Sequence, residues 1–138
     1  MLDDPVAYLD NACVTLKPQS VIDSIQDYYI NTPGCGGRSV HRYGTHVSKT
    51  ISQSRKKLAN FFSAPSVNEI VFTRNATHSL NQIAKGLEWN KGDVVLTTDR
   101  EHNSNLVPWL QLEQEQGIDH RVVRSNQDNT FNLESFEE

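Results

Sequence analysis

The sequence lacks the features that would place the chain in a membrane, on nucleic acid or in a secretory pathway. No apolar run in its 138 residues approaches the roughly 18 that a membrane-spanning helix needs. The first residues also show no basic segment followed by an apolar one, as a signal peptide would. Lys and Arg number 13 against 17 Asp and Glu, for a net charge of -4. We therefore expect no nucleic-acid partner and no membrane partner.

Cysteine is scarce as well. Cys13 and Cys35 stand alone, without the second pair that a zinc site or a disulfide framework would need. Free thiols are typical of a reducing compartment, so we expect a cytoplasmic protein. We assign neither cysteine a catalytic role, because no base is paired with either in the sequence. His41 and His46 are out of helical register with each other, so no metal site is predicted.

What the sequence does contain is an alternation of helical and strand patterns. Apolar residues at helical spacing predict helices over 19–30, with Val21, Ile22, Ile25, Tyr28 and Tyr29 on one face, and over 45–64, with Val47, Ile51, Leu58 and Phe61 or Phe62 inward. Beyond them, strands over 69–73, 92–98 and 119–125 alternate with helices over 75–89 and 104–117, and Asn132 is placed to cap a last helix. This order predicts an α/β fold with a mostly parallel sheet and flanking helices.

The first candidate site lies where the strand ending at Thr73 gives way to a helix beginning at about Ala76 or Thr77. The free backbone N–H groups and the threonine hydroxyl at such a junction suit a phosphate. The alternative is that Asn75 or Thr77 only caps the helix.

The second candidate is His102, in the stretch TTDREHNSNLVPW that follows another strand. Ligands of parallel α/β sheets bind beyond the carboxyl ends of strands. An imidazole there could cover the face of an aromatic cofactor, and the alternative is a surface histidine that helps to cap a helix. The glycine-rich stretch GCGGRSVHRYGTH, with Arg38, His41, Arg42 and His46, could bind an anion, but it matches neither of the usual glycine-rich phosphate motifs.

Taken together, four ordered stretches resemble the amino-terminal third of a pyridoxal-phosphate enzyme. These are YLDNACVTLKPQSVIDSIQDYY, SVHRYGTHVSKTISQSRKKLANFF, EIVFTRNATHSLNQIAKGL and GDVVLTTDREHNSNLVPW. In order and spacing they are similar to the cysteine desulfurase and selenocysteine lyase branch of the class V aminotransferases. The resemblance runs from about Tyr8 to the end of the chain.

The resemblance implies part of a fold-type I large domain and a homodimer with active sites near its interface. It implies chemistry that takes sulfur or selenium from cysteine or selenocysteine. In such an enzyme, the backbone at Ala76 and the side chain of Thr77 would hold the cofactor phosphate. His102, the catalytic candidate, would stack on the pyridine ring. His41 and Arg42 would belong to a loop near the active site and the dimer contact, and Asn11 would lie near the substrate.

The same resemblance divides the chain into an amino-terminal segment with its glycine-rich loop, 1–50, and the first part of the pyridoxal-phosphate-binding large domain, 51–138. Several residues depart from the family pattern: Cys13, Tyr43, Asn75, His78 and Asn103. The Schiff-base lysine of the family is expected beyond residue 138, since none of the six lysines lies in its motif: Lys17, Lys49, Lys56, Lys57, Lys85 and Lys91.

The leading hypothesis is therefore an amino-terminal fragment of a desulfurase-like enzyme, inactive alone without the lysine. We expect it to self-associate through exposed sheet edges and apolar surface. Three alternatives remain: a non-catalytic relative that binds a partner such as a full-length homologue, a different class V aminotransferase or epimerase, and an α/β domain without a ligand.

Overall fold

The computed structural model describes residues 7–137 and divides into two compact units, one up to Val71 and one from Phe72 onward. Unit 1 holds two helices and a short 3-10 turn; unit 2 holds the sheet and three helices. In chain order the elements are α1 (Gln19–Asn31), α2 (Arg42–Phe61), η1 (Val67–Glu69), α3 (Ala76–Gly86), β1 (Val94–Thr98), η2 (Asn103–Asn105), α4 (Val107–Gln116), β2 (Asp119–Val123) and α5 (Leu133–Glu137).

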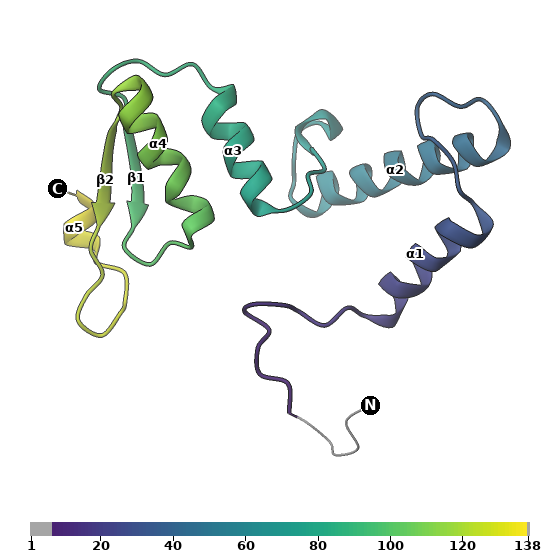
Figure 1. Cartoon of the computed structure of the whole chain (residues 1–138), viewed down its shortest axis with the longest axis horizontal. Coiled ribbons are helices and arrows are strands. Elements are labelled where there is room, and N and C mark those ends of the chain that lie inside the picture. The colour runs from purple at the N-terminus through teal and green to yellow at the C-terminus, as the bar shows by residue number, and fades with distance from the viewer. Residues whose placement is uncertain (1–6, 138) are drawn as a thin grey trace. The chain divides into compact units, whose positions relative to one another are not determined.

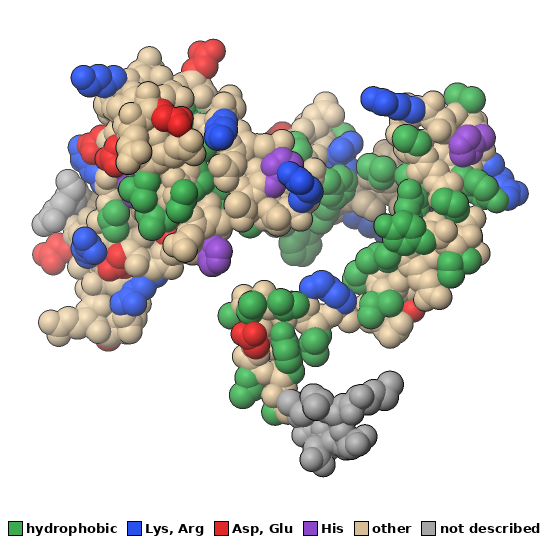
Figure 2. All heavy atoms as spheres, in the orientation of Figure 1, with side chains coloured by type: hydrophobic (Ala, Val, Ile, Leu, Met, Phe, Trp, Pro, Cys, Tyr) green, Lys and Arg blue, Asp and Glu red, His purple; other side chains and the backbone are tan. Residues whose placement is uncertain are grey.

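Unit 1 forms both predicted helices but buries little of their apolar faces. No residue of α1 is buried, and in α2 only Gly44 and Ala59 are. The expected inward positions of α2 are wrong at Phe61 and Phe62, which are 78% and 67% exposed, and at Ile51, which is 41% exposed. Hydrophobic side chains accordingly show on the surface of α1 and α2 (Figure 2).

The glycine-rich stretch of unit 1 is irregular, as predicted, and folds back against the start of α2. A Cβ atom on Gly44 would lie 2.4 Å from the Cβ of Ser39 and 2.6 Å from its carbonyl oxygen. A Cβ on Gly34 would lie 2.8 Å from the carbonyl carbon of Tyr43. Two of the glycines are therefore required by close approach of the backbone.

The predicted strand over 69–73 is wrong. Its first residue, Glu69, ends η1, and Ile70 to Thr73 have no strand assignment. Ile70 does have extended dihedral angles (φ −96°, ψ 112°). An extended segment becomes a strand only when a neighbouring strand takes its backbone hydrogen bonds, and among the described residues only β1 and β2 form a ladder.

Unit 2 is built around two parallel strands. β1 and β2 pair in register from Val94 with Asp119 to Thr98 with Val123, and α4 is the crossover between them (Figure 1). The core lies where α3, α4 and the strand ends meet, in a buried cluster of Ala84, Trp109, Leu112 and Ile118, with Leu80, Trp89 and Val95 packed against it. This confirms a parallel sheet with flanking helices, in the form of a partial α/β domain.

The helix ends of unit 2 follow from local chemistry. Gly117 ends α4 in the left-handed region, with φ 72°, as glycine does at many helix ends. The Asn132 side chain accepts a hydrogen bond from the Ser135 N–H (3.0 Å) at the start of α5, so the predicted cap is confirmed. Across residues 7–137, no helix combines the length and apolar character that a bilayer crossing demands.

Candidate functional site

The first candidate site is the start of α3, where Asn75 is the cap. Its side-chain oxygen accepts a hydrogen bond from the His78 N–H (2.9 Å). The Thr73 and Ser79 hydroxyls, 2.6 Å apart, tie the preceding segment to the first turn. Of the two residues predicted as possible helix caps, Asn75 caps α3 and Thr77 does not. The Thr77 hydroxyl is therefore not used for capping. The capping bond also explains why an asparagine suits position 75, where the sequence departs from the family pattern.

Hydrogen-bond donors remain available at this helix start. The backbone N–H groups of Ala76 and Thr77 and the Arg74 guanidinium have no acceptor among residues 7–137. Arg74 and Thr77 line a shallow cavity of about 490 Å³ together with Asn75, His78 and Asn81. Free N–H groups at the positive end of a helix, beside a guanidinium, form a site suited to a phosphate or a carboxylate.

His102, the second candidate, is exposed and caps η2. Its Nδ1 accepts a hydrogen bond from the Ser104 N–H (3.1 Å) and lies 2.9 Å from the Ser104 hydroxyl. The predicted capping role is therefore real, and it leaves the other edge and both faces of the imidazole uncovered. Because α3 packs against η2, Thr77 and His102 belong to neighbouring elements of one unit.

A group that we did not single out from the sequence lies beside His102. The Glu101 carboxylate accepts hydrogen bonds from the Thr98 hydroxyl (2.8 Å) and from the Asn105 side-chain amide (2.8 Å). These bonds, the one from Asn105 first, hold the pKa of Glu101 below its ordinary value. Asn105 in turn accepts a hydrogen bond from the Trp109 indole (3.1 Å). The spacing of four between Glu101, Asn105 and Trp109 did not indicate this arrangement from the sequence, because Glu101 precedes η2 and the intervening His102 is extended (φ −66°, ψ 146°).

The remaining predicted residues, Asn11, His41 and Arg42, lie in unit 1. The Asn11 carbonyl accepts a hydrogen bond from the Thr15 hydroxyl (3.2 Å) in an exposed turn. His41 caps α2, its Nδ1 accepting from the Gly44 N–H (3.4 Å). The Arg42 guanidinium lies over the Tyr43 ring, 5.1 Å from its centroid, and donates to the Tyr43 hydroxyl (3.2 Å). Tyr43, which departs from the family pattern, therefore interacts with Arg42 through both its ring and its hydroxyl group.

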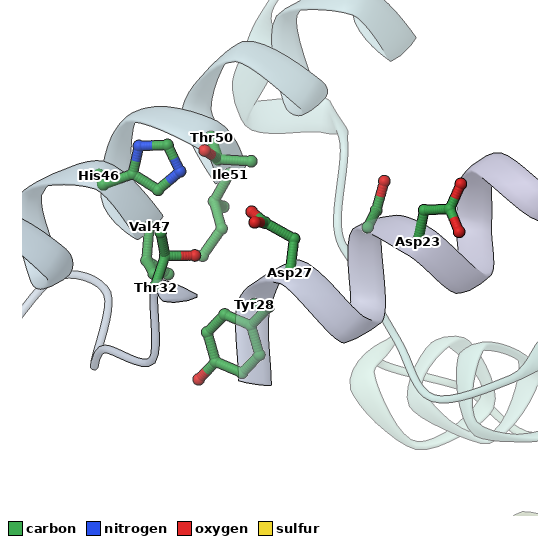
Figure 3. A pocket seen from close by; sticks show the side chains of 9 residues that line it. Asp23, Asp27, Tyr28, Thr32, His46, Val47, Thr50 and Ile51 are labelled. Carbon is green, nitrogen blue, oxygen red and sulfur yellow. The ribbon is translucent and has the colours of Figure 1, made fainter. Parts of the chain in front are cut away.

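Unit 1 also holds a groove between α1 and α2. It has a volume of about 550 Å³ and is lined by His46 of the glycine-rich stretch, whereas Asn11, His41 and Arg42 do not line it. Figure 3 shows Asp27 of α1 directed toward the α2 side chains His46 and Thr50, above the apolar Val47 and Ile51. Across residues 7–137, no three His, Cys, Asp or Glu side chains gather as a metal site would require.

Fold and site together define a partial α/β domain with a helix start whose free donors suit an anion and an exposed histidine that caps the neighbouring 3-10 turn. Residues 7–138 match the family model described as aminotransferase class-V, so the chain belongs to that family. The resemblance inferred from the four motifs is confirmed.

Among curated proteins the chain is 36% identical to a probable cysteine desulfurase of Synechocystis, over 96% of this chain and 32% of that protein. It is also 36% identical to a probable cysteine desulfurase of Pyrococcus abyssi, over 99% of this chain and 34% of the relative. Among solved structures it resembles the apo cysteine desulfurase of Thermococcus onnurineus, with a TM-score of 0.84 and 32% identity over 93% of this chain and 32% of the other. The chain spans about a third of the length of these relatives.

Proposed function

We propose that this chain is the cofactor-binding amino-terminal portion of a pyridoxal-phosphate-dependent cysteine desulfurase. The observation that carries the proposal is the family match across residues 7–138. The relatives that cover nearly the whole chain bear that name, and one related solved structure is a lyase with glycine covalently linked to its pyridoxal phosphate.

The residues at the start of α3 fit the phosphate of this cofactor. Thr77 and Arg74 line one cavity, no carboxylate lines it, and the N–H groups of Ala76 and Thr77 at this helix start have no acceptor among residues 7–137. When bound, pyridoxal phosphate supplies an electron sink for breaking bonds of an amino acid. In this proposal Ala76 and Thr77 bind the phosphate and His102 covers one face of the ring.

The substrate and the remaining parts of the enzyme are also proposals. The relatives' names indicate cysteine as the substrate, and the chain spans about a third of their length. The lysine that would hold the cofactor covalently would belong to the remaining part of such an enzyme. Asn11, His41 and Arg42 would serve the substrate end and a dimer contact. A cytoplasmic location agrees with Cys13 and Cys35, both exposed and free.

Titration with pyridoxal phosphate, followed by absorbance, tests the proposal. Wild-type chain should bind the cofactor reversibly, and borohydride reduction should leave no covalent adduct in the intact mass. Thr77→Ala should weaken binding by about 1 to 3 kcal/mol, roughly 5- to 150-fold, since it removes a hydroxyl from a charged group. Thr45→Ala, a matched change in the first turn of α2, should leave the affinity unchanged. Equal affinities for the Thr77→Ala variant and the wild type would reject the phosphate assignment.

A further inference from the structure

The stretch from Thr98 to Trp109 contains a continuous chain of hydrogen bonds around His102. Glu101 spans the turn between β1 and η2: one carboxylate oxygen accepts from the Thr98 hydroxyl (2.8 Å) and the Thr98 N–H (3.3 Å), and the other accepts from Asn105 (2.8 Å). Residue 102 lies inside the loop that these bonds close. The end of the strand and the start of the next turn are thereby held together by a single side chain.

The far end of this chain is anchored in the core. Trp109 is 8% exposed and belongs to the buried cluster of unit 2. Its indole N–H donates to the side-chain oxygen of Asn105 (3.1 Å), and this fixes which way the Asn105 amide points. Because the oxygen faces Trp109, the NH₂ group must face Glu101. The buried core therefore determines the orientation of an exposed loop.

His102 itself is held in one state by its capping bonds. Its Nδ1 accepts the Ser104 N–H, so the neutral imidazole carries its proton on Nε2. An exposed histidine ordinarily samples several rotamers and both tautomers. Here the ring orientation depends on where the Ser104 N–H lies, and that depends on the turn that Glu101 and Asn105 close.

We propose that Glu101 and Asn105 are positioning residues that fix the ring orientation and tautomer of His102. The inference rests on the proposed function only for its purpose, which is to present a fixed imidazole face to a planar cofactor. The positioning itself is a property of the chain alone. Neither Glu101 nor Asn105 needs to touch the cofactor.

The polarity of the hydrogen-bond chain supplies a sharp test. Glu101→Gln places an amide NH₂ where only acceptors fit, so one donor must face another, at Asn105, at Trp109 or at the Thr98 N–H. Adding Asn105→Asp repairs this without a change of shape: the new Gln oxygen accepts from Thr98, its NH₂ donates to the new carboxylate, and that carboxylate accepts from Trp109. Glu115→Gln is the matched control, since Glu115 also accepts from a side-chain amide, that of Gln111 (2.7 Å), on the exposed face of α4.

The measurement is nitrogen-15 NMR of the histidine rings in the purified chain, at about pH 8, where an ordinary imidazole is neutral. In wild type the two His102 nitrogens should be well separated in chemical shift, as a single tautomer requires. Glu101→Gln should move them toward each other, the double variant should restore the separation, and Glu115→Gln should change nothing. Unchanged His102 signals in Glu101→Gln would overturn the proposal. So would loss of folding in both the single and the double variant, since the network would then be structural only.

Addition of pyridoxal phosphate to the same samples separates the two proposals. A His102 signal that shifts with the cofactor in wild type and in the double variant, but less in Glu101→Gln, supports both. An intact tautomer pattern without any response to the cofactor would reject the proposed function and leave the positioning role standing. A response to the cofactor that is equal in all variants would reject the positioning role alone.

Discussion

The two units of this chain have similar numbers of apolar residues in their helices but bury them very differently. In unit 2, Trp109, Leu112, Ile118 and Ala84 are each at most 8% exposed and contact one another. In unit 1, α1 buries no side chain at all, and Ile25 at its centre is 53% exposed.

This difference in burial indicates which unit contributes most of the stability of the isolated chain. Isolated helices of this length are marginal in water, and most helical stability in proteins comes from packing of an apolar face. Unit 2 has this packing and unit 1 has little of it. We therefore expect slow amide exchange in unit 2 and fast exchange in α1 and α2.

The largest effect should come from opening the core of unit 2. Leu112 is 3% exposed and central to the cluster, so Leu112→Ala should cost about 2 to 5 kcal/mol of unfolding free energy. Leu110→Ala, on the same helix at a position 39% exposed, is the control and should cost much less. Urea unfolding followed by the amide NMR signals of unit 2 measures both. Equal losses would mean that the core does not dominate this unit.

In unit 1 the most sensitive position should be a glycine rather than an apolar side chain. Gly44→Ala would drive a Cβ into Ser39, so it should cost about 1 to 3 kcal/mol, the range for overpacking. Gly86→Ala, at the end of α3, meets nothing within 4 Å and should be neutral or stabilise by up to about 1 kcal/mol. Exchange rates of the α2 amides should rise only in the first variant. A tolerant Gly44 would show that the loop does not pack as described.

The smallest effect should be a loss of stability in acid that is confined to unit 2. Hydrogen bonds from Ser125, Asn105 and Thr130 lower the pKa values of Asp99, Glu101 and Asp128, respectively, and all three acids lie in this unit. A carboxyl whose folded pKa is depressed stabilises the fold above its unfolded pKa and loses that contribution as the pH falls through the folded value.

For Glu101 this window lies below about pH 4.5, its ordinary value. The urea midpoint of unit 2 should therefore change little between about pH 7 and pH 5 and fall as the pH goes from about 4.5 toward 3. Glu101→Gln should fall less steeply, and Glu115→Gln should follow the wild type. A midpoint that is independent of pH would contradict the assigned hydrogen bonds.

Local features of the fold were predictable from the sequence, and features that depend on a partner were not. The helix predicted over 19–30 is α1 almost to the residue, because apolar spacing is a local property of the sequence. The strand predicted over 69–73 failed because strand formation requires a neighbour. The apolar faces of α1 and α2 were correctly grouped, but their burial also requires something to pack against.

In the candidate site too, residues with a local sequence signal were predictable, and a residue whose role depends on distant partners was not. Thr77 and His102 could be named because each follows an extended segment and precedes a helical one. The part played by Glu101 could not, because its two partners come from a strand end and a 3-10 turn, and the second partner, Asn105, is itself held by a buried indole. The sites of Ala76, Thr77, His102, Asn11, His41 and Arg42 remain predictions of role, each now with a defined local environment.

The two tryptophans of the sequence both lie in unit 2, so their fluorescence reports on the folding of that unit. Trp89 and Trp109 are the only two in the sequence, their rings meet edge to face at 6.1 Å, and the Trp89 indole donates to the Ala84 carbonyl (2.7 Å). Tryptophan fluorescence, excited at a wavelength that the four tyrosines of unit 1 do not absorb, therefore reads the sheet-bearing half alone, whereas far-ultraviolet circular dichroism is weighted toward the long helices of the other half. If the halves melt independently, heating curves from the two signals will separate, and each curve can be assigned to its half without any label.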